Sequence, residues 1–270
     1  MTGTAGQKRV PAGFLARLKI PLPPLEVQKK IAAELEKADT LRRKREEQIK
    51  RLDDLLQATF LDMFGDPVTN PKGWNTDTLG SLSNSITDGK HGDCNNDNNS
   101  GYFFISAKDI HDGMIDYSKA RQIVKKEFEE VHRRTNLQVN DLVIVNTGSI
   151  GKMAIVKPDP RTRQTTFQKS VAIVKPKHEI LNVYYLKTLF EIVLKDIVNA
   201  SSGSTLKNLL LSRMRELTLL VPPVHFQREY EDFVLKSNKI LDALTKSLQR
   251  QEHLFNSLMQ RAFKGELELK

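Results

Sequence analysis

Gly148-Ser149-Ile150-Gly151-Lys152 is the segment of this sequence that comes closest to a nucleotide-binding motif. A phosphate-binding loop needs a glycine where Asn146 stands and a Ser or Thr where Met153 stands, so the match fails. Residues 93–104 begin like a calcium loop but lack its glycine and its final glutamate. The six histidines have no metal-binding spacing, and no nucleophile elbow or dinucleotide fingerprint occurs. We therefore expect neither catalytic residues nor a metal site.

A different chemistry is available to the basic and amide side chains of the central region. Arg, Lys, Gln and Asn are the residue types that bind phosphates and base edges of DNA. Each of them could equally be a solvated surface charge, and two arginines at a helix end could offset the helix dipole. The predicted DNA-binding residues are Lys90, His91, Arg133, Arg134, Arg161, Arg163, Gln164, Gln168, Lys169 and Lys207.

An internal repeat shows which elements position these residues. Residues 15–64 align with residues 214–263 at a constant offset of 199 positions, without a gap. Each copy has a short apolar strand, then Pro23-Pro24 or Pro222-Pro223, then about forty residues without Gly or Pro. Proline suits the first turn of a helix, so the double prolines mark the start of two long helices.

Both helices have a seam with the 4-3 spacing of a coiled coil. Two seam positions of the first helix are Arg42 and Arg45, where the second helix has Leu241 and Leu244. Either the arginine stems lie along the seam with their charges in water, or buried polar groups specify the partner helix. The predicted seams are Ile31, Leu35, Ala38, Arg42, Arg45, Ile49, Leu52, Leu56, Thr59 and Met63, and Tyr230, Val234, Ser237, Leu241, Leu244, Leu248, Gln251, Phe255, Leu258 and Ala262.

Between the helices, the pattern predicts a mixed α/β domain. The Gly-, Asn- and Asp-rich stretch 88–101 is expected to be a long exposed loop, and residues 102–104 to belong to the core. The expected strands are Tyr102–Ser106, Asp141–Val145, Met153–Lys157, Ser170–Val174 and Glu216–Leu220. The expected helices are Lys125–Arg134, Asn182–Val198 and a short one near Thr205–Leu210.

Composition restricts the class of protein. The net charge is +9, and residues 121–177 alone hold 12 basic and 5 acidic residues, a net charge of +7. An acidic partner such as nucleic acid is one explanation, and a merely basic protein is the other. The lone Cys94 argues against a disulfide framework. No apolar run suits a membrane span or a signal peptide, so we expect a cytoplasmic protein without membrane contact.

The sequence resembles the specificity (S) subunit of type I restriction-modification systems. The carrying residues are the paired Pro-Pro-x-x-x-Gln elements, ending at Gln28 and Gln227 and each followed by a long helix. The segments TDGKHG, YFFISAKDIHDGMID, NDLVIVNTGSIGKMAIV and GSTLKNLLLSRM resemble that family's target recognition domains.

The resemblance implies an α+β fold with an antiparallel coiled coil. The expected domains are 1–24, the tail of a first recognition domain, 25–66 and 224–270, the two helices, and 67–223, one recognition domain. A chain of this half-length form would read one half of a bipartite double-stranded DNA site without catalysis and without a cofactor of its own.

The resemblance also implies partners. The helices would dock methyltransferase (M) subunits, which use S-adenosylmethionine, and the restriction (R) subunit would join through the complex. Two copies would form a homodimer that reads both half-sites. A recognition subunit of a fused restriction-methyltransferase, an RNA-binding protein and a coiled-coil interaction protein are the alternatives.

Overall fold

The computed structural model describes residues 10–17, 19–20, 22–200 and 208–267, with no side-chain description for 196–200. The chain forms two compact units, residues 1–54 with 237–270 and residues 55–236. The helices are α1 Ala12–Leu15, α2 Leu25–Phe64, α3 Lys125–Thr135, α4 Val183–Ala200, α5 Leu211–Glu216 and α6 Val224–Lys264. The strands are β1 Thr76–Thr78, β2 Ser83–Asp88, β3 Phe103–Ile105, β4 Ile110–His111, β5 Met114–Ile115, β6 Arg121–Gln122, β7 Leu142–Val145, β8 Met153–Ile155, β9 Thr165–Phe167, β10 Val171–Pro176 and β11 Thr218–Leu220.

The glutamine of each Pro-Pro-x-x-x-Gln element closes the first turn of its helix. Gln28 Nε2 donates to the carbonyl oxygen of Pro23 at 2.7 Å, and Gln227 Nε2 donates to that of Pro222, also at 2.7 Å. The carbonyl of the first proline precedes the helix and has no hydrogen-bond partner inside it. The glutamine side chain satisfies that carbonyl. The repeated motif is therefore a device for starting a long helix.

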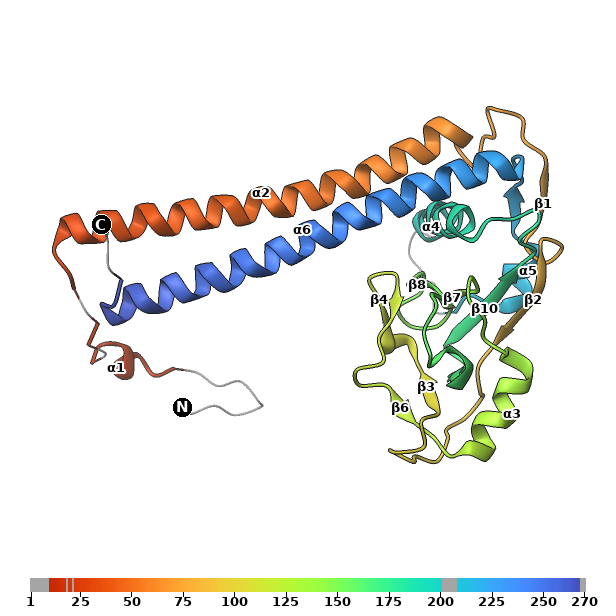
Figure 1. Cartoon of the computed structure of the whole chain (residues 1–270), viewed down its shortest axis with the longest axis horizontal. Coiled ribbons are helices and arrows are strands. Elements are labelled where there is room, and N and C mark those ends of the chain that lie inside the picture. Colours follow the sequence, from red (N-terminus) through yellow and green to blue (C-terminus); the bar gives the residue numbers. More distant parts are fainter. Residues whose placement is uncertain (1–9, 18, 21, 201–207, 268–270) are drawn as a thin grey trace. The chain divides into compact units, whose positions relative to one another are not determined.

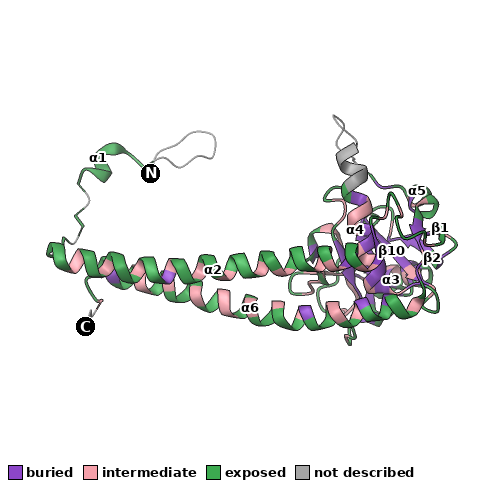
Figure 2. Cartoon of the chain, turned by 90° about the horizontal axis from the view of Figure 1, so that it is seen from above, coloured by how far each residue is buried: buried purple, intermediate pink, exposed green. Residues whose placement is uncertain are grey.

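In the unit of residues 1–54 and 237–270, α2 and α6 pack side by side as an antiparallel coiled coil. The beginning of α2 lies beside the end of α6 in both views (Figures 1 and 2). Arg42 of α2 and Phe255 of α6 make one contact between them, at 5.8 Å from guanidinium carbon to ring centroid. All the predicted seam residues of both helices are buried or half-buried, as a 4-3 seam requires.

The unit of residues 55–236 is built on a four-stranded antiparallel sheet in the order β2-β10-β7-β8. Successive residues of β7 alternate between its two faces: Leu142 and Ile144 pack into one core, Val143 and Val145 into another. The first core contains α4 and an aromatic cluster of Phe60, Phe64, Tyr185 and Tyr230, whose ring centroids lie 4.7–5.7 Å apart. The second contains the small sheet β6-β3-β9.

Most predicted elements of this unit are confirmed to within a few residues. Phe104 is buried, as expected of a core strand. The helix expected near Thr205–Leu210 was wrong over its described part: residues 208–210 are extended and α5 begins at Leu211. Glu216, predicted to be in a strand, ends α5. The pattern missed the strands β1, β2, β4, β5, β6 and β9, and by missing β2 it placed Asp88 in a loop.

Candidate nucleic-acid interface

The loop after β2 is fastened to the segment after β9. Lys90 N donates to the Phe167 carbonyl at 2.7 Å, and Lys169 N donates to the Lys90 carbonyl at 3.0 Å. Gly89 makes this crossing possible, because a Cβ there would lie 1.8 Å from the Phe167 oxygen. Two predicted DNA-binding segments, 88–92 and 161–169, therefore meet at one place.

A hollow of about 370 Å³ lies at this crossing. A short extension of β7 forms one wall: Thr147 pairs with Asn208, and Leu209 N donates to the Asn146 carbonyl at 2.8 Å. The strands thus supply a rigid support for polar side chains at their ends. The hollow is lined by Asp88, His91, Asn146, Thr147, Lys169 and residues 208–212.

The acidic residue that lines the hollow has a charged partner, whereas the lysine that lines it has no described ion pair. Asp88, buried at the end of β2, accepts a hydrogen bond from Arg134 Nη1 at 3.1 Å and lies 3.2 Å from His91 Nε2. Arg134 Nη2 also donates to the Gly89 carbonyl at 2.8 Å. Lys169 is exposed and makes no ion pair with the described residues. The hollow therefore presents a cation to solvent while its one carboxylate is already paired.

Asn146 is a polar residue of the hollow that the DNA-binding prediction did not include. The residue is 7% exposed, and its Oδ1 has no hydrogen-bond partner among the described residues. A buried amide without a partner is costly, so it is a place where a ligand group or water would bind favourably. The signal in the sequence that could have identified Asn146 is its position directly after the apolar strand β7.

Besides Arg134, the predicted DNA-binding cations Lys90 and Arg161 are held by acidic residues. Lys90 lies 3.0 Å from Glu130 and 3.9 Å from Glu127, and the hydrogen bond to Glu130 raises its pKa. Arg161 binds Asp159 through two hydrogen bonds of 2.8 and 2.7 Å and lies over the ring of Tyr117.

The ion pair with Arg161 strongly lowers the pKa of the Asp159 carboxyl group. The hydrogen bonds from Arg161 lower the pKa of Asp159 from 3.8 to about 2. A guanidinium that makes a bidentate pair with one carboxylate and lies over an aromatic ring is held in place, which suits a residue that stabilises its loop.

The remaining predicted residues are distributed around these two segments. Arg163 and Gln164 are exposed in the turn before β9, Arg133 is exposed near the end of α3, and no ion pair of either arginine occurs among the described residues. Gln168 Oε1 accepts from Ser170 Oγ at 3.4 Å. Lys207 lies outside the described residues.

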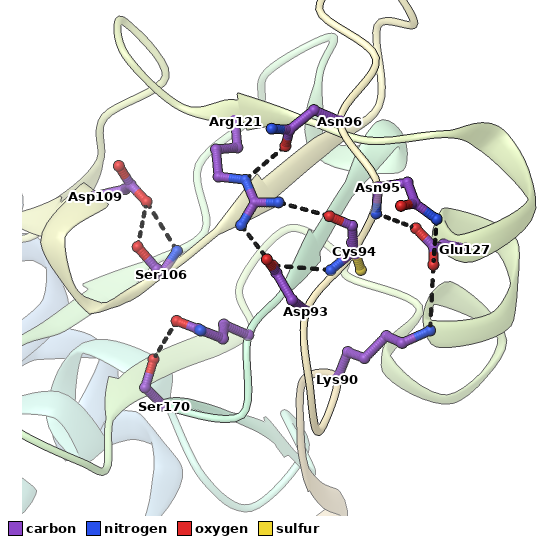
Figure 3. Close-up of polar contacts among 11 residues, drawn as sticks. Lys90, Asp93, Cys94, Asn95, Asn96, Ser106, Asp109, Arg121, Glu127 and Ser170 are labelled. Carbon is purple, nitrogen blue, oxygen red and sulfur yellow. Dashed lines mark hydrogen bonds and ion pairs between the residues drawn. The ribbon is translucent and has the colours of Figure 1, made fainter.

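Figure 3 shows a second polar cluster that sequence reasoning missed, with Arg121 at its centre. Its guanidinium donates to Asn96 Oδ1 at 2.9 Å, to Asp93 Oδ1 at 2.7 Å and to the Cys94 carbonyl at 2.7 Å. Glu127 accepts from Asn95 N at 2.6 Å on the other side of the same stretch. The predicted exposed loop is therefore tied down, and Cys94 is buried in it.

Other chemistry was sought over the same part of the chain. No group of three or more His, Cys, Asp or Glu residues able to hold a metal occurs among the described residues. No described helix is long and apolar enough to cross a membrane.

Comparison with known proteins gives concordant matches. A family model described as "Type I restriction modification DNA specificity domain" matches residues 2–51 and 71–252. The specificity subunit of the type I restriction enzyme EcoBI from Escherichia coli is 24% identical over 302 residues, covering 98% of this chain and 62% of that protein.

Two solved structures share the fold. A chain from a study of complex assembly and conformational transition of the type I R-M system has a TM-score of 0.63 at 19% identity, covering 92% of this chain and 62% of that one. The HsdS subunit from Thermoanaerobacter tengcongensis has a TM-score of 0.56 at 19% identity, covering 99% and 65%. The chain thus spans less than two thirds of the length of each of these relatives.

Proposed function

The chain belongs to the family of type I restriction modification DNA specificity domains, and on that premise we propose that it is a non-catalytic DNA-recognition subunit. In this proposal the unit of residues 55–236 reads one half-site of double-stranded DNA. The coiled coil docks M subunits, which bring S-adenosylmethionine and the methylation chemistry, and the R subunit joins through that complex. We place this assembly in the cytoplasm.

The observation that carries the proposal is the crossing of the 88–92 loop with the segment after β9. It brings His91 and Lys169 to the rim of one hollow, and Lys169 is an exposed cation without a described ion pair. Phosphate contacts of this kind provide most of the affinity for a duplex and fix its orientation. Asn146 Oδ1 has no described partner, and asparagine is the residue type that binds the donor and acceptor edge of adenine in a bidentate manner.

The coiled coil supports the docking role. Leu41 of α2 and Ile240 and Leu254 of α6 are 53–54% exposed although the seam between the helices is filled. Apolar side chains that the seam does not use are available to a partner protein. In this proposal each copy reads one half-site, and two copies related by a two-fold axis read an inverted repeat.

A selection experiment tests this function. The chain, purified with its M subunits, is incubated with a library of duplexes that contain a randomised region, and the bound DNA is sequenced. We expect an enriched inverted repeat with a fixed spacer. Library RNA of the same sequences is the control and should compete weakly. Bound DNA without any enriched motif would refute sequence recognition, and an enriched site with two different halves would refute the symmetric dimer.

A further inference from the structure

The seam between α2 and α6 contains a polar stretch. Arg42 and Arg45 of α2 and Gln251 of α6 are half-buried at seam positions. Two buried atoms of this stretch have no hydrogen-bond partner among the described residues, Arg45 Nε and Gln251 Oε1. The first is a donor and the second an acceptor, so the two groups are chemically complementary.

The contact of Arg42 with Phe255 indicates the register of the two helices in this stretch. The Arg42 guanidinium lies 5.8 Å from the Phe255 ring centroid and is held by Asp39 at 2.8 Å and Glu46 at 3.5 Å. Because the helices are antiparallel, Arg45, one turn further along α2, lies beside the turn of α6 that precedes Phe255. Gln251 is on that turn.

The internal repeat shows that this arrangement depends on pairing unlike helices. At the constant offset of 199, Arg42 and Arg45 correspond to Leu241 and Leu244 of α6. In the opposite direction, Gln251 and Phe255 correspond to Leu52 and Leu56 of α2. Every polar member of the stretch therefore has a leucine at the equivalent position of the other helix.

The consequences differ between the three possible antiparallel pairs. Pairing α2 with α6 brings Arg45 to Gln251 and Arg42 to an aromatic ring, a favourable cation–π geometry. Pairing two α2 helices in the same register sets the arginines against Leu52 and Leu56, which offer neither an acceptor nor an aromatic ring across the seam, so that only the acceptors on α2 itself remain. Pairing two α6 helices sets Gln251 against leucine. A buried polar group without a partner is unfavourable, and this is how single polar seam residues select partners in coiled coils.

We propose that Arg42, Arg45 and Gln251 form a pairing code, by which the seam of α2 accepts α6 and rejects a second α2. When two copies of the chain assemble, each α2 then stays with an α6, and contacts between copies use other surfaces. If the arginines merely extend their charges into water, Gln251 is energetically independent of them.

Substitutions taken from the repeat itself test the code in the full-length chain. Arg42→Leu with Arg45→Leu gives α2 the residues of α6, and Gln251→Leu gives α6 the residue of α2. Each change alone removes the complementary polar group across the seam, and we expect the melting temperature to fall by about 3–6 °C. The triple variant should return to within about 2 °C of the parent or exceed it. Helix melting followed by circular dichroism measures this coupling.

Two further variants make the test specific. The control, Arg43→Leu with Arg51→Leu, removes two exposed arginines outside the seam and should show no coupling with Gln251→Leu. The transplant starts from the triple variant, in which the code has been replaced by leucines. Leu241→Arg with Leu244→Arg places the two arginines on α6, and a further Leu52→Gln places the glutamine on α2, so that the code is rebuilt with the two helices exchanged. We expect that addition to restore the melting temperature. Additive melting shifts, or a transplant that Leu52→Gln does not rescue, would overturn the proposal.

Discussion

The salt dependence of DNA binding distinguishes the cations that are available to phosphates from those that are already paired. Arg163 and Lys169 are exposed and have no described ion pair, whereas Lys90 and Arg161 are held by carboxylates. The perturbation is therefore a pair of double variants with the same change of charge. One is Arg163→Ala with Lys169→Ala, and the other is Lys90→Ala with Arg161→Ala.

The expected magnitude comes from counterion release. Each phosphate contact contributes about 0.9 to the slope of log K against log salt concentration, so losing two contacts lowers the slope by about 1.8. Between about 50 and about 200 mM salt, the parent should then lose about twelvefold more affinity than the variant without Arg163 and Lys169. The variant without Lys90 and Arg161 should keep the parental slope, because those cations bind Glu130 and Asp159.

Fluorescence anisotropy of a labelled duplex, titrated at several salt concentrations with the M subunits present, measures both slopes. Equal slopes for the two double variants would refute the reasoning, since the ion pairs would then have no influence on which cations meet phosphate. A larger decrease in the variant without Lys90 and Arg161 would show that DNA displaces their carboxylates. The melting temperatures of both variants report separately on folding.

Three further predictions concern individual side chains. Gln227→Leu removes the partner of three backbone groups and should cost roughly 2–4 kcal/mol of unfolding free energy in urea, whereas Gln28→Leu removes one hydrogen bond and should cost about 1 kcal/mol. Because the pKa of Asp159 is lowered to about 2 in the folded state, its stabilisation is present above pH 3.8 and is lost as the pH falls toward 2. Asp159→Asn should remove that part of the pH profile of unfolding, on the order of 1 kcal/mol after solvent screening. Asn146→Ala should relax the preference at one base position about tenfold in library selection, while Asn75→Ala, at an exposed residue outside the hollow, should not.

The long helices could be predicted because their signal is local and repeated. The double prolines, the absence of Gly and Pro and the 4-3 spacing all lie within each helix, and the offset of 199 shows the pattern twice. Strands such as β7 could be predicted from a continuous apolar run. By contrast, β9 is three residues, Thr165–Phe167, and its partner β3 lies about sixty residues earlier in the chain. No local pattern indicates that pairing.

The site could be predicted only in outline, for the same reason. The crossing at Gly89 joins segments about eighty residues apart, and Lys90 and Arg134 find their carboxylates 40 and 46 residues away. A sequence indicates that a cation is present, but its availability depends on these distant partners. The pair of Asp159 and Arg161 is the exception, since the two residues are close in the chain.

The two copies of the Pro-Pro-x-x-x-Gln element show how position in the fold changes the energy of a repeated motif. Gln28 is half-buried and makes one hydrogen bond, within its own turn. Gln227 is fully buried, and besides Pro222 it binds Asn182 N at 2.8 Å and the Ile180 carbonyl at 3.0 Å. Those extra partners lie where the chain enters α4, so the glutamine that starts α6 also fixes the first turn of α4. One motif thus serves as a helix start in both copies and as a domain anchor in the second, and only the second should be indispensable to folding.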